Sequence, residues 1–107
     1  MIIHTEIEHS RCAVQLVGRF DAHEAPGFRS AVHPLLTSET NRVHLDLSQV
    51  AFVDSTALAE LVRLQKAAQA LGGEVVIDHL SDPVRVILEI TDLAEVFTIS
   101  DAPPESP

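Results

Sequence analysis

Residues 42–59 read RVHLDLSQVAFVDSTALA, and this stretch joins a strand pattern to a helix pattern. In its first part, apolar residues occupy every second position, which is typical of a half-buried β-strand: Val43, Leu45 and Leu47. From Ala57 onward, apolar residues recur at spacings of four and three, as far as Leu71, which is typical of an amphipathic helix. The stretch therefore predicts a strand that leads directly into a helix.

Three short oxygen-bearing side chains, Asp54, Ser55 and Thr56, lie where the predicted helix begins. The first turn of a helix leaves four backbone N–H groups without partners, and such side chains accept hydrogen bonds from them. The same helix end carries partial positive charge and favours anions such as phosphate. The junction therefore predicts a helix cap, and it also offers hydroxyl groups at a place where a phosphate would be tolerated.

The N-terminal part predicts a β-hairpin. Ile3, Thr5 and Ile7 alternate with more polar residues over 3–8, and every second residue over 12–17 is apolar on one face (Cys12, Val14 and Leu16), with a tight turn at 9–11 between the two segments. Two short strands this close in sequence are expected to pair antiparallel. Gly18 follows and predicts a bulge or turn that ends the second strand.

Residues 24–37 predict a helix. Pro26 suits its first turn, because the missing N–H costs nothing there, whereas Pro34 should kink the helix or end its regular part. The expected apolar face consists of Phe28, Ala31, Val32, Leu35 and Leu36.

The C-terminal part continues the alternation of helices and strands. Gly72 and Gly73 predict the left-handed cap that ends the central helix. Residues 74–78 contain a continuous apolar run, which favours a strand covered on both faces. Residues 81–83 read Ser-Asp-Pro and predict a helix start, and residues 96–99 predict a last strand.

These elements predict one α/β domain with the order ββαβαβαβ, in which helices pack on a mixed sheet of four to five strands. The expected domain covers residues 1–100. Residues 101–107 contain three prolines and are expected to form a flexible tail.

The composition narrows the classes of partner and the cellular setting that the chain can have. The chain of 107 residues carries 16 acidic and 7 basic side chains, a net charge of −9, so nucleic acids and anionic lipids are poor partners. This acidity suits a cationic protein partner, or it serves solubility alone. No apolar run is long enough to span a membrane. Cys12 is the single cysteine, which excludes an intrachain disulfide and fits a cytoplasmic protein.

Enzymatic and cofactor chemistry has little support in the sequence. A catalytic Ser55 would need a neighbouring histidine, and the Gly-x-Ser-x-Gly motif is missing. His23 is the histidine of interest, since it follows Asp21 in a loop expected near Ser55. Metal-ligand spacings and a phosphate-binding loop are absent, so we expect no metal and no cofactor. The remaining histidines are interpreted as surface or strand residues: His4, His9, His33, His44 and His79.

Three segments carry a resemblance to a known family. They are residues 18–21 (GRFD), residues 54–58 (DSTAL) and residues 81–85 (SDPVR), the last followed by Ile87, Leu88 and Leu93. In this order and at this spacing they resemble the STAS domain, and more narrowly the bacterial anti-sigma factor antagonists. The resemblance covers residues 2–100 and implies the STAS fold.

The resemblance implies a phosphorylation switch at Ser55, with Thr56 as the neighbouring alternative. The site would be lined by Asp21, Asp54, Thr56 and Ala57. The implied partner is an ATP-using serine kinase that is also the anti-sigma factor, and a serine phosphatase would reverse the modification. The unphosphorylated protein would bind the kinase and free the sigma factor. The implied partner contacts are Asp21, His23, Ser55, Thr56, Leu58, Glu60 and Arg63.

Two departures from the family pattern concern, respectively, this switch and the identity of its partner. Ala57 stands where many members have glycine, which predicts an altered backbone approach by a kinase, and the Pro-rich tail stands in place of a C-terminal helix. A second hypothesis is therefore a STAS-like interaction module without phosphorylation, such as a scaffold or an accessory subunit of a transport complex.

Overall fold

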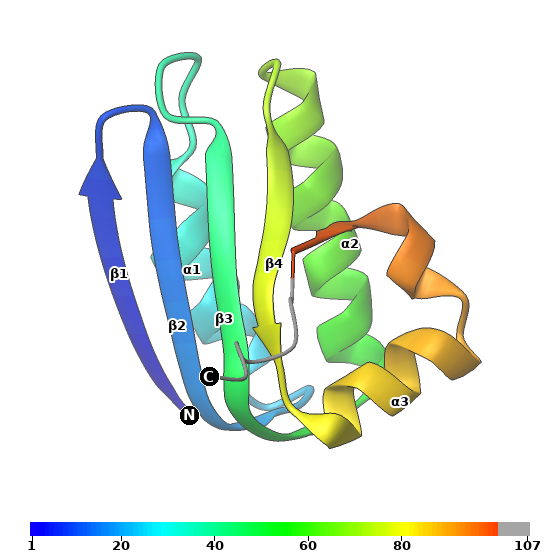
Figure 1. The fold of residues 1–107 in the computed structure, drawn as a ribbon. Helices are drawn as coiled ribbons and strands as arrows, with labels where there is room; N and C mark the ends of the chain where they lie inside the picture. Colours follow the sequence, from blue (N-terminus) through cyan, green and yellow to red (C-terminus); the bar gives the residue numbers. More distant parts are fainter. Residues whose placement is uncertain (101–107) are drawn as a thin grey trace, which may run out of the picture.

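The computed structural model describes residues 1–100, and the predicted tail at 101–107 lies outside the described residues. The order of elements confirms the predicted ββαβαβαβ arrangement (Figure 1). The strands are β1 (Ile2–Glu8), β2 (Arg11–Phe20), β3 (Arg42–Val53), β4 (Glu74–Leu80) and β5 (Thr98–Ile99). The helices are α1 (Ala25–Val32), α2 (Ser55–Ala70) and α3 (Asp82–Ile90), and two short 3-10 helices are η1 (His33–Leu35) and η2 (Leu93–Val96).

The strands form one mixed sheet in the order β1-β2-β3-β4-β5. β1 pairs antiparallel with β2, as expected for the hairpin, and the remaining neighbours pair parallel. α1 and α2 lie together on one face of the sheet, behind it in Figure 1, and α3 lies beside the lower end of β4. β3 is the central strand and runs straight into α2. The junction between them therefore lies in the middle of the sheet, at the end where β3 finishes.

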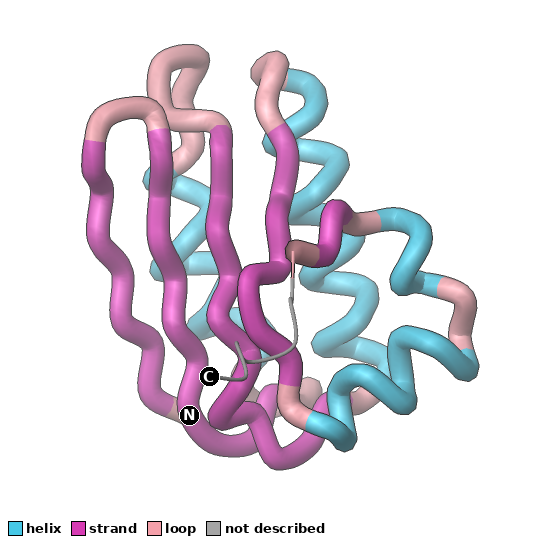
Figure 2. Tube along the Cα trace, viewed as in Figure 1, coloured by secondary structure: helices cyan, strands magenta, loops and turns pink. Residues whose placement is uncertain are grey.

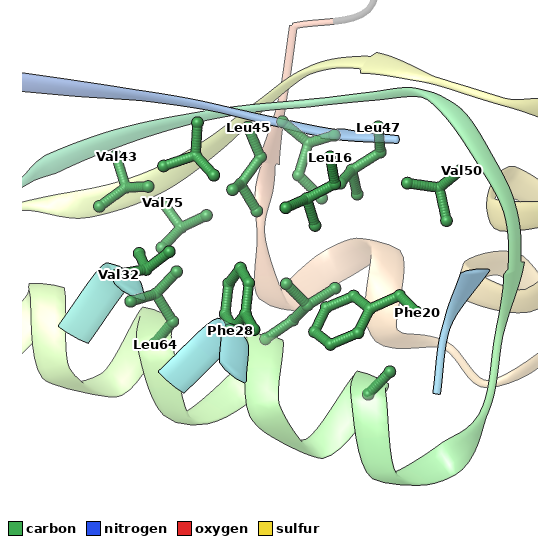
Figure 3. Packing of buried hydrophobic residues seen from close by; sticks show 14 of the residues in the cluster. Leu16, Phe20, Phe28, Val32, Val43, Leu45, Leu47, Val50, Leu64 and Val75 are labelled. Carbon is green, nitrogen blue, oxygen red and sulfur yellow. The ribbon is translucent and has the colours of Figure 1, made fainter. Parts of the chain in front are cut away.

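The core fills the space between the sheet and the two helices (Figure 3). Val43, Leu45 and Leu47 of β3 are fully buried, which confirms the alternation read from the sequence. Opposite them, the rings of Phe20 and Phe28 pack with centroids 4.9 Å apart and bring α1 against the end of β2. A tilted aromatic pair of this kind adds about 0.5–1.5 kcal/mol to the burial of the two rings.

Glycines bend the chain where the sequence predicts it. Gly18 has φ +112° and lies at a register shift between β2 and β3, and the strand continues beyond this bulge to Phe20. Gly72 has φ +87° and follows the last turn of α2, which confirms the predicted left-handed helix end.

The predicted helix over residues 24–37 is shorter and has a different buried face. Its regular part ends at Val32 and continues as η1 around Pro34, as the proline predicts. Ala31 is exposed, whereas Ala25 is buried with Phe28 and Val32. At 3.6 residues per turn, Ala31 lies roughly 90° away from the centre of the face formed by these three residues. The prediction for Ala31 was therefore wrong.

The last strand is shorter than the predicted 96–99. Val96 belongs to η2, the helical turn that Figure 2 marks between α3 and β5, and only Thr98 and Ile99 pair with β4. The Val96 carbonyl accepts a hydrogen bond of 2.7 Å from the side chain of Gln65 in α2. The same side chain accepts one of 2.6 Å from the backbone N–H of Val75. Gln65 thus connects α2 to β4 and holds Val96 outside the sheet.

Candidate functional site

The candidate site lies at the junction of β3 and α2. Asp54 has an extended backbone, and its Oδ1 atom accepts a hydrogen bond of 2.9 Å from the backbone N–H of Ala57. This confirms the predicted helix cap. The hydrogen bond from Ala57 is the main reason that the pKa of Asp54 is lowered from its ordinary value. Asp54 is therefore a carboxylate at neutral pH.

Asp54 also holds the loop between β2 and α1. Its Oδ2 atom accepts a hydrogen bond of 2.9 Å from the backbone N–H of Ala22, and its own N–H donates to the carbonyl of Phe20 at 3.3 Å. The loop that carries Asp21 and His23 is thereby placed next to the start of α2. The contact is made through the backbone of Ala22, which no sequence pattern indicated.

The side chains of Asp21 and His23 are placed differently. Asp21 turns toward its own helix, where its Oδ1 atom accepts from the N–H of Glu24 at 3.1 Å. Its carbonyl accepts from the N–H groups of Glu24 and Ala25, so Asp21 organises the start of α1. His23 is exposed in this loop. Among residues 1–100, no hydrogen bond joins a histidine to Ser55.

Ser55 and Thr56 are the first two residues of α2, and both are exposed. Within residues 1–100, neither hydroxyl group forms a hydrogen bond, so neither is required for the cap that Asp54 supplies. The structure thus presents two free hydroxyl groups at the positive end of a sixteen-residue helix. Such a position tolerates added negative charge.

The next two residues face inward. Ala57 is fully buried, so its methyl group lies in the core and adds nothing to the exposed surface at Ser55. Its contribution to the site is the N–H group that Asp54 accepts. Leu58 is also buried, with 6% of its surface exposed, and that remaining part lies at a groove described below.

The resemblance implied Glu60 as a partner contact, and the structure places its side chain inside the domain. Its side chain is 1% exposed and forms two hydrogen bonds with Arg29 of α1, at 3.0 and 2.5 Å. Arg63 donates a third at 3.4 Å. The hydrogen bonds from Arg29 lower the pKa of Glu60, with burial opposing them. Glu60 therefore joins α1 to α2. Its spacing from Ala57 and Leu64 is the sequence signal that could have indicated a buried position.

His33 lies at the same cluster, with its Nε2 atom 3.7 Å from a Glu60 oxygen. This atom is buried and has no hydrogen-bond partner in the described part of the chain. Burial lowers the pKa of His33, although the Glu60 carboxylate acts in the opposite direction. His33 is therefore neutral at pH 7 and contributes packing rather than a salt bridge.

An open groove of about 460 Å³ runs along α2 beside the segment between α3 and η2. The sequence did not indicate this groove, because its two sides come from segments about 30 residues apart. Its lining residues are Ser55, Leu58, Ala59, Val62, Arg63, Lys66, Thr91 and Leu93.

Residues 1–100 contain neither a metal-binding cluster nor a membrane-spanning helix. In residues 1–100, no three histidine, cysteine, aspartate or glutamate side chains are grouped so that they could hold a metal ion. The described helices include none that is both long and apolar enough to cross a membrane.

Comparison with known proteins defines the class of protein to which this chain belongs. The profile described as "Mlab, STAS domain" matches residues 3–99, and the chain belongs to the STAS domain family. One relative is the anti-sigma-B factor antagonist of Listeria monocytogenes, which is 30% identical over 86 residues, covering 80% of this chain and 75% of the relative. Another is the anti-sigma-B factor antagonist of Bacillus subtilis, which is 26% identical over 102 residues, covering 94% of this chain and 93% of the relative.

Solved structures share the fold. The anti-sigma factor antagonist SpoIIAA in its unphosphorylated form superposes with a TM-score of 0.80 at 15% identity, covering 96% of this chain and 90% of SpoIIAA. The Bacillus SpoIIAA in its phosphorylated form superposes with a TM-score of 0.73 at 14% identity, covering 96% and 93% of the two chains. These similarities confirm the predicted STAS fold.

Proposed function

We propose that this protein is an anti-sigma factor antagonist that phosphorylation of Ser55 switches off. The observation that carries the proposal is the free, exposed hydroxyl of Ser55 at the first position of α2, within the segment that resembles the family's phosphorylation site. Relatives at 30% and 26% identity are anti-sigma-B factor antagonists, which supports the same role here. The protein would act in the cytoplasm as a regulator of transcription and not as an enzyme.

The switch works through surface charge. A phosphate on Ser55 adds about −1.5 to −2 charges and three acceptor oxygens. The N-terminus of α2 contributes roughly half a positive charge, which tolerates the phosphate without a change of fold. Asp54 is ionised beside it and repels the phosphate, so no tight internal contact forms. The phosphate therefore stays on the surface, where it changes the charge that a partner contacts.

The partner in this proposal is a serine kinase that is also the anti-sigma factor and that supplies the ATP. The kinase binds the unphosphorylated protein and frees its sigma factor, and it dissociates after transferring phosphate to Ser55. A serine phosphatase restores the binding form. The proposed contacts are the exposed or half-exposed residues around Ser55 together with the edge of Leu58, and Glu60 is left out because it is buried. They are Asp21, His23, Ser55, Thr56, Leu58 and Arg63.

Phosphosite mapping tests the proposal. Tagged protein is incubated with Mg-ATP in a lysate of its source cell and is then analysed by mass spectrometry, with Ser55→Ala and Thr56→Ala as matched variants. We expect phosphate on Ser55 in the wild type and in Thr56→Ala, and none in Ser55→Ala.

An unmodified Ser55 would contradict the switch, provided that a control substrate is phosphorylated in the same lysate. That result would favour the second hypothesis, a STAS interaction module that binds its partner constitutively. Phosphate on Thr56 alone would move the modification to the neighbouring hydroxyl.

A further inference from the structure

The two edges of the sheet differ in how they are protected. β1 forms one edge and β5 the other (Figure 1). β5 is two residues long, whereas β1 pairs with β2 over seven residues without a register shift. A sheet edge is a row of unpaired backbone groups, which proteins protect by a short strand, a lysine, a proline or a bulge. β1 has none of these devices, since residues 2–8 read IIHTEIE. Its outer edge is therefore open to another strand.

The two faces of β1 differ in character. Ile3, Thr5 and Ile7 lie opposite core residues of β2, so they are on the face of the sheet that carries α1 and α2. Ile7 is nevertheless 50% exposed. His4 and Glu6 are on the other face, and neither side chain has a hydrogen bond or ion pair within residues 1–100. β1 thus carries exposed apolar surface on one face and unpaired polar groups on the other.

The sequence of β1 is complementary to its own reverse. When two copies pair antiparallel with Thr5 at the centre, Ile3 lies opposite Ile7 of the second copy. In the same register, His4 lies opposite Glu6 of the second copy, where an imidazole N–H can donate to a carboxylate. The twofold axis repeats both pairs. Apolar and polar cross-strand pairs of these kinds stabilise an antiparallel sheet.

Other antiparallel registers that keep the two faces matched are less favourable. A pairing centred on Glu6 places this carboxylate opposite itself, and one centred on Ile7 places it opposite Glu8. Like charges directly opposite one another destabilise a sheet. A pairing centred on His4 leaves Glu8 beyond the end of the second copy's strand. The register centred on Thr5 uses all seven residues and opposes no two like charges.

We propose that two copies of this protein pair through β1, antiparallel about Thr5, so that their two five-stranded sheets become one continuous sheet. The contact is isologous and closes after two copies, because each copy has one such edge. β2 separates β1 from β3 in the sheet, so the start of α2 remains exposed in both copies. The dimer therefore presents the candidate site twice, and it forms whether or not Ser55 is phosphorylated.

Two properties make this dimer a weak one. The net charge of −9 on each copy opposes association. The contact is also small, because seven paired residues extend over about 23 Å, and small interfaces belong to transient complexes. Monomer and dimer are therefore in equilibrium. Added salt screens the repulsion between the copies and should tighten the dimer.

Sedimentation equilibrium of the whole chain tests the association. The protein concentration is raised from about 10 μM to about 1 mM, the range in which a weak contact is populated. We expect the average mass to rise from the monomer value toward the dimer value and to go no further. A mass that stays at the monomer value at every concentration and salt would overturn the proposal. A mass that rises beyond the dimer would overturn the closed pairing.

Two lysine substitutions locate the contact. Ile7→Lys replaces the exposed apolar residue of β1 and should raise the dissociation constant at least about tenfold, although it also lowers the net negative charge. Ile90→Lys is the matched control, because Ile90 is 72% exposed on α3, far from β1 in the sheet (Figure 1). It should leave the dissociation constant unchanged or slightly lower. Dimers that resist Ile7→Lys but are lost with Ile90→Lys would move the contact to α3 and overturn the proposal.

Engineered cysteines test the register. In Thr5→Cys, the two new thiols lie directly opposite one another, with Cα atoms roughly 4.5–5.5 Å apart, within the reach of a disulfide. In Glu8→Cys, the two new thiols lie six residues apart along the paired strands, about 20 Å. Both positions are exposed, and the native Cys12 is fully buried, so the wild type gives the background.

After mild oxidation, non-reducing electrophoresis should show a covalent dimer for Thr5→Cys and only background for Glu8→Cys. Equal crosslinking of the two variants would overturn the register centred on Thr5. Crosslinking of Glu8→Cys alone would do the same, since it requires another alignment of the strands. Each of these results leaves the phosphorylation of Ser55 to its own test.

Discussion

At the scale of single residues, Asp54 organises the candidate site. One of its carboxylate oxygens caps α2 at Ala57, and the other holds the N–H of Ala22 in the loop before α1. A single side chain therefore fixes the start of the helix and the position of the loop. Ser55 remains free because Asp54 supplies the cap.

Removing this carboxylate should loosen both elements. Asp54→Ala loses both hydrogen bonds and should lower the Tm measured by circular dichroism. Asp54→Asn is the matched variant: asparagine is also a good cap, but its amide keeps one acceptor oxygen where the carboxylate has two. We therefore expect its Tm to lie between those of Asp54→Ala and the wild type. Equal Tm values for all three proteins would show that neither contact stabilises the domain.

Glu60 gives a prediction with a defined pH dependence. Its pKa in the folded protein lies below the ordinary value of 4.5, mainly because Arg29 donates hydrogen bonds to the charged form. The unfolded chain therefore binds a proton first as the pH falls. The stabilisation is complete above about pH 5 and is lost as the pH falls through the folded pKa.

Glu60→Gln keeps the shape and removes the charge. We expect it to lower the free energy of unfolding by about 1–2 kcal/mol at pH 7. The value is at the low end for charged hydrogen bonds, because Arg29 and Arg63 are more than half exposed and screened by solvent. Urea unfolding at pH 7 and pH 3.5 measures it. The difference between wild type and variant should shrink at pH 3.5, and a difference that grew would contradict the assigned direction.

At the scale of elements, the connection from α2 to β4 depends on close backbone approach. A Cβ atom added at Gly73 would lie 1.9 Å from the carbonyl oxygen of Asn41, which no rotamer change can relieve. The N–H of the next residue, Glu74, donates to that carbonyl at 3.1 Å. The end of α2 is therefore packed against the chain that enters β3.

Two glycine substitutions distinguish the effect of this close backbone contact from the ordinary effect of glycine on helix propensity. Gly73→Ala should cost about 3 kcal/mol, the upper part of the range for overpacking, because backbone must move. Gly27→Ala, in α1, meets no atom within 4 Å and should instead stabilise the protein by about 0.5–1 kcal/mol. Urea unfolding of both variants is the measurement. A Gly73→Ala protein as stable as the wild type would mean that the two segments can separate freely.

At the scale of the whole molecule, the sheet and the two helices on it form one core that the candidate site does not enter. The hydroxyl of Ser55 points away from this core, as its exposure and lack of hydrogen bonds indicate. A phosphate on Ser55 would contact the N-terminal end of α2 and solvent. The fold should therefore be the same in both forms of the protein.

Amide spectra of phosphorylated and unphosphorylated protein test this rigidity. We expect shifts at residues 54–58 and in the loop at 21–24 that Asp54 holds. We expect no shifts in the second half of β1 or in the first half of β2, where residues pair at the opposite end of the sheet. Widespread shifts in those strands would replace the rigid switch with a conformational one. Ser55→Asp serves as a partial mimic that needs no kinase.

The strands and most helix ends could be predicted because they follow from local physics. Alternation of apolar residues gave β2 and β3, Pro34 ended α1, and Asp54 capped α2. Ala31 failed for a local reason, because it lies off the buried face of its own helix, whereas the end of the sheet depended on a neighbour distant in sequence. Val96 left the sheet because Gln65 binds its carbonyl.

By itself, the sequence determined the order of elements, the buried faces of the strands and the place of the Ser55 hydroxyl, because periodicity, capping and turn preferences act within a few residues. Only the tertiary structure decided that Glu60 is paired with Arg29 and that Arg63 and Lys66 border a groove. A buried charge is stable only when distant partners such as Arg29 meet it, and a groove exists only between elements that packing brings together.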